Sequence, residues 1–372
     1  MRVADLSRVL AGPLATMILA DLGADVVKIE LPGTGDDTRS WGPPWASDGE
    51  ATYFLGANRN KRSVALDLRD PDDLVVAGAL VRRADVVVEN FRPGVMARYG
   101  LDHETIAAGQ PAAITCRIAG LGLGDVPGYD FLAQAVGGLM SITGEPGGEP
   151  LKVGVALVDV MAGLHAAIGV LAALRHRERT GEGQLVTVDL LSTTLFALAN
   201  QATAYLDAGV VPGRMGNRHP SIAPYETLRT ADAHVVVAVG NDQQFATFAD
   251  ALDAGHLATD VRFSTNAARV TNRSALVASL EALLSTSSAA TWLSRLAASG
   301  IPCGMVNQVD EAFALARELG LEPAVTTVRA DGGEVMTVAN PIHLSRTPAR
   351  YHTAPPRLDE HGTEVRAEAA TW

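Results

Sequence analysis

The sequence predicts an α/β protein with a parallel β-sheet, and three observations support that prediction. The chain has 372 residues, which suggests two domains, or one large domain with an insertion. Apolar residues make up 47% and charged residues 19%, so the chain can bury a sizeable core. In the first third, short Val/Ile runs alternate with helical segments of about a dozen residues, a rhythm typical of βαβ units.

The elements of this first region are expected in a fixed order. A strand and a turn at 2–12 lead into a helix that ends at Gly23, which suits a helix C-cap. The helix at 71–84 begins with a proline and two acids and ends with two arginines, as its dipole favours. Further strands are expected at 24–31, 63–70, 84–91 and 112–118. A parallel sheet of this kind binds ligands at the carboxyl ends of its strands.

Residues 155–180 predict a long buried helix. The 22 residues between Lys152 and Arg175 have only Asp159 and His165 as polar breaks, and their length alone would allow a membrane span. The ionisable Asp159 and three glycines favour a buried helix instead. Charged residues also interrupt any secretory signal within the first ten positions. We therefore expect a cytoplasmic protein that makes no membrane contact.

The chain changes character between about 205 and 320. A strand at 233–240 is followed by amphipathic segments with helical spacing at 243–252, 274–284, 291–299 and 311–319. We interpret this region as a smaller, largely helical domain. Residues 335–345 are expected as strands that return to the first domain. The predicted domains are therefore 1–200, 201–325 and the returning segment 326–372.

Composition and missing motifs argue against several classes of function. A net charge of −12 disfavours a nucleic-acid binder, and 5% aromatic residues disfavour base-stacking platforms. Two cysteines, Cys116 and Cys303, cannot make a disulfide scaffold or a zinc site. The sequence has no Walker A, H-E-x-x-H, G-x-S-x-G or C-x-x-C motif, and its first βα turn lacks G-x-G-x-x-G. No metal site is expected.

A set of cations lies near the expected strands and loops. An ordinary solvent-exposed position on the protein surface is enough to explain the presence of any single one of them. Several at the carboxyl ends of one sheet would suit a polyanionic small ligand, because the planar fork of arginine binds phosphate through two charge-assisted bonds. The candidates are Arg8, Arg39, Arg59, Lys61, Arg62, Arg69, Arg92 and Arg98.

Asp159 stands where an apolar stretch meets an apolar helix. It can be an N-cap that satisfies free backbone N–H groups. The same donors can keep a carboxylate ionised in apolar surroundings, and an oriented carboxylate can act as a nucleophile. Tyr129 and Asp130 leave a similar choice open, between an ordinary helix start and a functional site.

Segments throughout the chain resemble the class III CoA-transferases, the group of formyl-CoA transferase and carnitine CoA-transferase, with α-methylacyl-CoA racemase as a relative of the same fold. The resemblance covers nearly the whole length, in family order, through LSRVLAGPLATMILADLGADVVKIE, GDDTRSW, NRNKRSVALDL, ADVVVENFRPGVMARYGL, GYDFLAQAVGGLMSITG, KVGVALVDVMAGLHAAIGVLAAL, GNRHPSIAPYETLRTAD, AVGNDQQF and IPCGMVNQVDEAF. It implies a Rossmann-like large domain built from both chain ends, an inserted smaller α+β domain, and an interlocked homodimer.

The resemblance also implies an activity, the movement of CoA from an acyl-CoA to a free carboxylic acid. A coenzyme A thioester is then the substrate, and no cofactor is permanently bound. The family's nucleophile is an aspartate in a G-V-x-x-x-D segment, which is Asp159 here. It would form an anhydride and then an aspartyl-CoA thioester. Gly240 and Asn241 occupy the place of a loop that closes over the family's active site.

The resemblance assigns CoA contacts to several short segments. The stretch Arg8, Val9, Leu10 and Ala11 would pack against the adenine end of CoA. Tyr129 and Asp130 would lie near the pantetheine and the thioester. The remaining contacts are Leu66, Arg69, Asn90, Phe91, Arg92 and Arg98, and we expect Arg69, Arg92 and Arg98 to include the phosphate partners.

The chain departs from the family pattern at three places. Tyr129 stands where the racemases have the histidine of their acid–base pair, and a tyrosine with a pKa near 10 is a poor base near neutrality. This favours transfer, with an acyl-CoA racemase or epimerase and a silent CoA-binding protein as the alternatives. Leu31 replaces an arginine of some transferases, and the loop at 119–128 is shorter than usual.

Overall fold

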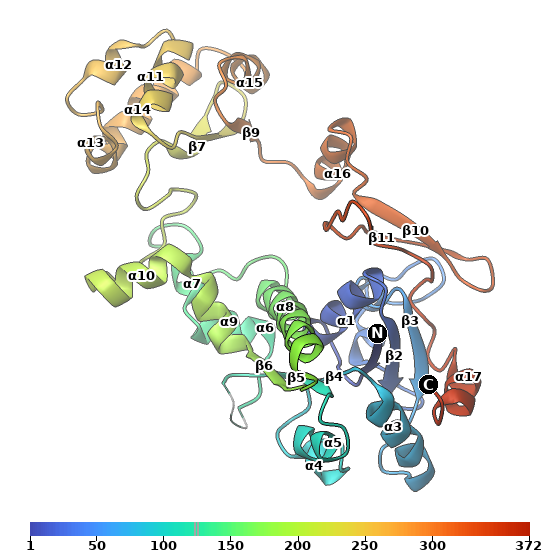
Figure 1. Cartoon of the computed structure of the whole chain (residues 1–372). Coiled ribbons are helices and arrows are strands. Elements are labelled where there is room, and N and C mark those ends of the chain that lie inside the picture. Colours follow the sequence, from blue (N-terminus) through green and yellow to red (C-terminus); the bar gives the residue numbers. More distant parts are fainter. Residues whose placement is uncertain (123, 125) are drawn as a thin grey trace. The chain divides into compact units, whose positions relative to one another are not determined.

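The computed structural model describes residues 1–122, 124 and 126–372 (Figure 1). Contacts divide the chain into two compact units. The first comprises Met1–Met140, Lys152–Val211 and Glu322–Trp372, and the second comprises Ser141–Leu151 and Pro212–Leu321. Each unit has its own buried apolar core. The first unit is therefore assembled from three separate stretches of chain, which include both termini.

A six-stranded sheet forms the centre of the first unit, with strand order β3-β2-β1-β4-β5-β6. Every pair of neighbouring strands is parallel. This order is that of doubly wound nucleotide-binding folds, so the predicted parallel sheet is confirmed. The strands are β1 (Arg2–Asp5), β2 (Asp25–Glu30), β3 (Lys61–Ala65), β4 (Val86–Glu89), β5 (Ile114–Ala119) and β6 (Leu185–Asp189). The edge strand β6 was not among the predicted strands.

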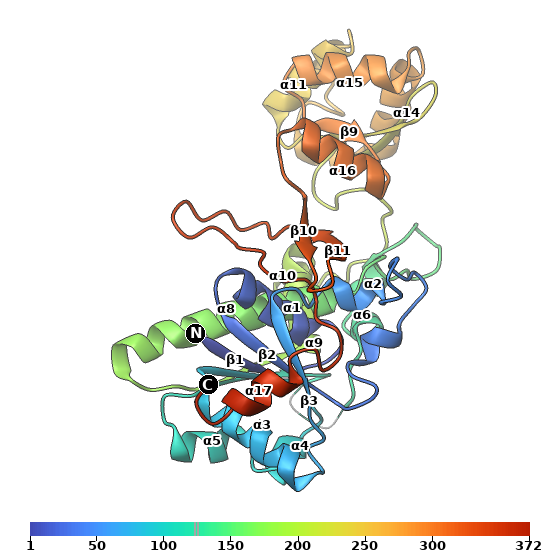
Figure 2. The same ribbon diagram turned by 90° about the vertical axis from the view of Figure 1, so that its right-hand side faces the viewer.

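Helices cover both faces of this sheet (Figure 2). On one face α1 (Ala11–Asp21) and α8 (Leu157–Thr180) bury Ala15, Leu19, Ala166 and Val170 against strand residues. The other face is covered by α3 (Pro71–Arg83), α4 (Val95–Arg98), α5 (His103–Gly109) and α17 (Gly362–Glu368). Successive side chains of a strand point to opposite faces, so adjacent residues of β1 enter different cores.

Short helices and two more elements complete the first unit. The helices are η1 (Asp37–Ser40), α2 (Thr52–Leu55), α6 (Asp130–Val136), α9 (Leu190–Ala197) and α10 (Ala199–Ala208), and α7 (Leu139–Ile142) spans the boundary to the second unit. Strands β10 (Ala324–Val328) and β11 (Glu334–Val338) pair only with each other among the described residues. The expected strand at 335–345 is therefore wrong beyond Val338, where Pro341 lacks the N–H that a ladder needs.

The second unit is an antiparallel sheet covered by helices. Strands β7 (Tyr225–Arg229), β8 (His234–Ala238) and β9 (Cys303–Met305) pair in that order. The amphipathic segments predicted from the sequence form α11 (Asp242–Ala251), α14 (Arg273–Leu284), α15 (Ala289–Ala298) and α16 (Val309–Glu318), and two short helices, α12 (His256–Thr259) and α13 (Asn266–Thr271), are added. Phe245, Phe248 and Trp292 lie in its core.

Helix α8 is long and apolar enough to cross a membrane by length and composition alone. It packs against α1 and against the sheet, and 44% of its most apolar stretch is buried inside the protein. This agrees with the expected buried helix on one side. The outward-facing side keeps large apolar residues in solvent, namely Leu164, Ile168 and Leu171.

Candidate active site

Three hollows in the first unit share lining residues at the carboxyl ends of the strands. The central cleft has a volume of about 380 Å³ and is lined by Arg8, Asn90, Tyr129 and Asp159, among others. The strand-end pocket of about 190 Å³ shares Arg8 and Phe91 with it. The lateral cleft of about 610 Å³ shares Val9, Leu10, Tyr129 and Asp159 with the central cleft. Asp159 therefore lies where the central and lateral clefts meet.

Most residues proposed from the sequence line one of these hollows. Val9, Leu10, Ala11, Asn90, Phe91, Arg92, Tyr129 and Asp159 line the central cleft, as does Arg8. Leu66 and Arg69 line the strand-end pocket, and so does Leu31. Asp130 lines the lateral cleft. Arg98 lines none of the three, although its neighbour Tyr99 lines the strand-end pocket. Gly240 and Asn241 belong to the second unit.

Asp159 sits in the first turn of α8, and the residue is only 8% exposed. The helix N-cap is Ala156, which offers no side-chain acceptor. The cap is supplied from α6, because Asp130 Oδ1 accepts from the N–H groups of Val158 at 2.7 Å and Asp159 at 3.3 Å. The expectation that Asp159 is itself the N-cap is therefore wrong, since those donors bind Asp130.

The ionisation of Asp159 also differs from the expectation. Burial, and then the neighbouring charge of Asp130, raise the pKa of Asp159 from 3.8 to about 7. The helix-start donors that could have kept it ionised are used by Asp130. At neutral pH, Asp159 of the enzyme without substrate is therefore about half ionised.

Asp130 is held in place by a buried glutamine. Gln134 Nε2 donates to Asp130 Oδ2 at 2.7 Å, and Gln134 Oε1 accepts from the N–H of Val153 at 2.9 Å. The Gln134 side chain is fully buried. Residues 130, 134 and 153 thus tie the start of α6 to the segment that leads into α8.

The loop after β1 forms the wall between the central and lateral clefts. Val9 adopts φ = 71°, a left-handed conformation that strains a β-branched residue. Its N–H donates to Asp36 Oδ1 at 3.2 Å. The flanking Arg8 exchanges two backbone–amide hydrogen bonds with Asn90, at 2.9 and 2.8 Å. The surrounding contacts therefore hold this loop in a conformation it would not adopt alone.

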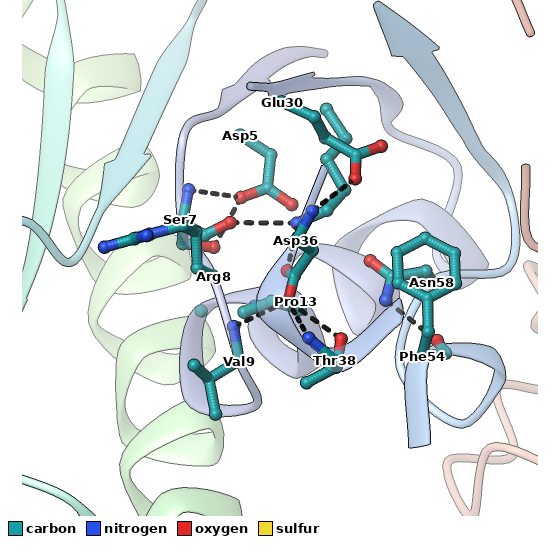
Figure 3. A network of polar contacts seen from close by, with 12 residues as sticks. Asp5, Ser7, Arg8, Val9, Pro13, Glu30, Asp36, Thr38, Phe54 and Asn58 are labelled. Atoms are coloured by element: carbon teal, nitrogen blue, oxygen red, sulfur yellow. Dashed lines mark hydrogen bonds and ion pairs between the residues drawn. The ribbon is translucent and has the colours of Figure 1, made fainter. Parts of the chain in front are cut away.

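A buried network of polar and charged side chains adjoins that loop (Figure 3). Lys28 Nζ lies 2.9 Å from Asp36 Oδ2 and donates to the Ser7 carbonyl at 2.8 Å. Lys61 Nζ lies 3.0 Å from Asp5 Oδ2. Burial alone would raise the pKa of Asp5, but Lys61 and Lys28 lower it to about 2. Burial lowers the pKa of Lys61 to about 8, against the opposing effect of Asp5. Both pairs are charged at neutral pH, and the Lys28–Asp36 pair is bonded to the loop through the Ser7 carbonyl and the Val9 N–H.

The sequence reasoning missed the role of this network. Several cations that were candidates for binding a polyanionic ligand form ion pairs with carboxylates of the same chain instead. Arg59 pairs with Asp21 at 2.6 Å, Arg39 pairs with Glu30 at 2.7 Å, and Arg62 pairs with Asp25 at 2.8 Å. Lys61 and Arg62 begin β3 and so do not lie at its carboxyl end. A signal was present in the sequence: Asp5 and Lys28 stand inside apolar strand segments, where only paired charges are tolerated.

The comparisons with known proteins agree with this fold. The family model described as CoA-transferase family III matches residues 1–362. The succinate–glutarate CoA-transferase of Agrobacterium fabrum is 42% identical over 385 residues, covering 100% of this chain and 95% of that protein. The acetyl-CoA:oxalate CoA-transferase of Acetobacter aceti is 40% identical over 374 residues, covering 99% and 94%. A crystal structure of a CaiB/BaiF family protein from Brucella suis has a TM-score of 0.86 at 42% identity, covering 99% and 98%.

Proposed function

We propose a mechanism from one premise: the chain belongs to CoA-transferase family III. It is an enzyme that moves CoA from an acyl-CoA to a free carboxylic acid. Its substrates are CoA thioesters, and it needs no permanently bound cofactor. The names of the relatives reported above include succinate, glutarate and oxalate, which are dicarboxylic acids, and one name also includes acetyl-CoA, whose acid has a single carboxylate. We propose short dicarboxylic acids as the substrate class of this enzyme.

Asp159 is the nucleophile in this proposal. Its carboxylate attacks the thioester carbonyl, the C–S bond breaks, and CoA thiolate leaves an acyl-aspartyl anhydride. The thiolate attacks the aspartyl carbon of the anhydride, which releases the donor acid and leaves an aspartyl-CoA thioester. The acceptor carboxylate then displaces the thiolate, and the thiolate attacks the acceptor acyl group and frees Asp159. Each step exchanges one acyl bond for another, so no net proton is needed.

The burial of Asp159 supports this role. A carboxylate whose pKa is raised to about 7 is destabilised in its charged form relative to water. Formation of the anhydride or the thioester removes that charge from the buried site. The environment that disfavours the free carboxylate therefore favours the covalent intermediates, and it leaves a more basic nucleophile.

The chain of hollows suggests how CoA is bound. We place the adenine in the strand-end pocket, between Leu66 and Tyr99, with the pantetheine in the central cleft. Arg69, Arg92 and Arg98 are the proposed phosphate partners. Val9 and Leu10 line the same clefts as Asp159, so we place them beside the thioester rather than at the adenine. Gly240 and Asn241 are the proposed closing loop.

The outer face of α8 supports the proposed interlocked homodimer. Leu164, Ile168 and Leu171 are exposed there, and Phe196 of α9 and Leu206 of α10 are exposed by 76% and 79%. Large apolar surfaces of this kind mark association sites. A second copy of the chain would cover them. The domain limits 1–200, 201–325 and 326–372 stay a proposal beside the compact units, which assign 201–211 and 322–325 to the first unit and 141–151 to the second. We also propose a cytoplasmic location, which suits the free Cys116 and Cys303.

The first test of the mechanism replaces the nucleophile. We expect Asp159→Ala to abolish CoA transfer and to leave the Kd for CoA within a few-fold of wild type, because the CoA contacts lie elsewhere. Turnover is measured with succinyl-CoA and glutarate, and binding is measured by calorimetry. A variant that turns over at the wild-type rate would contradict the role of Asp159. If the α-proton of the acyl group exchanged with deuterated water while no CoA moved between acids, the reaction would be racemisation.

A further inference from the structure

We propose that Lys152 is the receptor for the distal carboxylate of the acid that reacts at Asp159. The inference rests on the proposed exchange of dicarboxylic acids and assigns that specificity to one side chain. Lys152 lines the lateral cleft together with Asp159, in the segment just before α8. One carboxylate of the acid would then lie at the nucleophile while the other binds the ammonium group.

The two clefts meet at Asp159 and differ in the residues that line them, which provides separate places for CoA and for the acid. The central cleft contains Arg8 and Arg92 and adjoins the strand-end pocket, so it is the side that suits CoA phosphates. The lateral cleft shares Val9, Leu10, Tyr129 and Asp159 with the central cleft, and its other lining residues are different. An acyl group attached to CoA in the central cleft can therefore extend past Asp159 into the lateral cleft.

The walls of the lateral cleft suit a short carbon chain between two polar ends. Leu10, Val155 and Val160 provide apolar surface for methylene groups. Trp41 and Tyr53 stand nearly perpendicular, with ring centroids 5.2 Å apart, and form one side. Burial, and then the charges of Asp159, Asp130 and Asp36, raise the pKa of Tyr53 to about 12. Its hydroxyl stays protonated near neutrality and can donate a hydrogen bond into the cleft.

The charge of the cleft requires a cation for a second carboxylate. Asp130 and Asp159 both line it, and an acid with two negative charges would be repelled by them. Among the described lining residues, Lys152 alone carries a positive charge. A monocarboxylic acid places its single charge at the reacting end and has no use for this group.

Lys152 is free to bind an anion. Its Nζ donates to the carbonyl of Val153 at 3.2 Å, and within the described chain it has no carboxylate within 4 Å. Arg39 and Lys61, by contrast, are fixed in buried ion pairs. An ammonium group with spare donors at the mouth of a cleft can form charge-assisted bonds with a carboxylate.

The experiment compares two acceptors of equal length in the full-length enzyme. Glutarate and pentanoate have the same number of carbons and differ by one carboxylate. Both are tested with one saturating donor, succinyl-CoA, so that any effect on the donor cancels in the ratio of the two kcat/KM values. We expect Lys152→Met to lower the glutarate-to-pentanoate ratio by about 10- to 100-fold, mainly through the KM for glutarate. We expect Lys152→Arg to restore most of it.

Arg175→Met is the matched control, since it removes the same charge from an exposed position of α8 that pairs only with Glu178 among the described residues. It should leave the ratio unchanged. An unchanged ratio in Lys152→Met, with circular dichroism showing a folded protein, would overturn the assignment. If wild type preferred pentanoate, the proposed substrate class would be wrong. If Asp159→Ala still transferred CoA, the mechanism itself would be wrong, whatever Lys152 does.

Discussion

At the scale of single residues, the environment of Asp159 could be predicted only in part. Its apolar surroundings and its place at a helix start were visible in the sequence. The carboxylate of Asp130, 29 positions earlier, was not, because capping by a residue from another helix is a tertiary contact. That contact takes the backbone donors away from Asp159 and adds a like charge, and both effects raise its pKa.

The raised pKa of Asp159 predicts the pH dependence of the reaction. Below its pKa of about 7 the group is protonated and cannot attack, so kcat/KM should fall about tenfold per pH unit as the pH drops below 7. Above that value the rate should level off. The measurement is kcat/KM between pH 5 and 9. An aspartate of ordinary pKa would give a flat profile over this range, and that result would contradict the burial argument.

At the scale of elements, the contact between α6 and the start of α8 controls both stability and chemistry. Asp130→Ala should lower the free energy of unfolding by about 1–2 kcal/mol, because the N–H groups of Val158 and Asp159 lose their acceptor. Asp130→Asn keeps that acceptor and loses only the charge and the bond from Gln134, so its loss should be smaller. Urea unfolding of the two variants measures the difference.

The variants Asp130→Ala and Asp130→Asn also show how the charge of Asp130, as distinct from its capping of α8, affects the pH profile. Both variants remove the charge that helps to raise the pKa of Asp159. In both, the midpoint of the profile should therefore move below 7, whatever the stability of each variant. A midpoint that stays at 7 would mean that burial alone sets this pKa.

Regular elements with a clear period were predictable, and irregular ones were not. Helix α3 has its proline, acids and arginines in the expected places, and Asp70 caps it. Helix α17 was missed because Val365, within it, and Ala369 and Trp372, just after it, are too few apolar residues to show a period, although all three are buried against the sheet. Part of the loop at 119–128 lies outside the described residues, at positions 123 and 125.

At the scale of the whole molecule, composition could suggest two domains but could not show their connectivity. Helix α8 is apolar on both sides, buried on one and exposed on the other, and in the proposed dimer a second copy of the chain would cover the exposed side. Local sequence cannot distinguish a protein partner from lipid, because both favour apolar side chains.

The exposed face of α8 predicts the oligomeric state. Ile168 is 63% exposed in the single chain. Ile168→Glu should shift the protein from dimer to monomer, because a charge would then be buried in the interface. Val75→Glu, on the exposed side of α3 at 67% exposure, is the control and should stay dimeric. Sedimentation velocity distinguishes the species. A wild-type protein that is monomeric at micromolar concentration would contradict the proposed dimer.

The most direct measurement is to trap the covalent intermediate. Full-length enzyme is incubated with succinyl-CoA without an acceptor acid, quenched with hydroxylamine, digested and mapped by mass spectrometry. We predict a hydroxamate at Asp159 with release of free CoA, and no such product in Asp159→Asn. An unmodified Asp159 in enzyme that exchanges CoA between acids, or a hydroxamate at Asp130 instead, would contradict the proposal that Asp159 holds CoA during transfer.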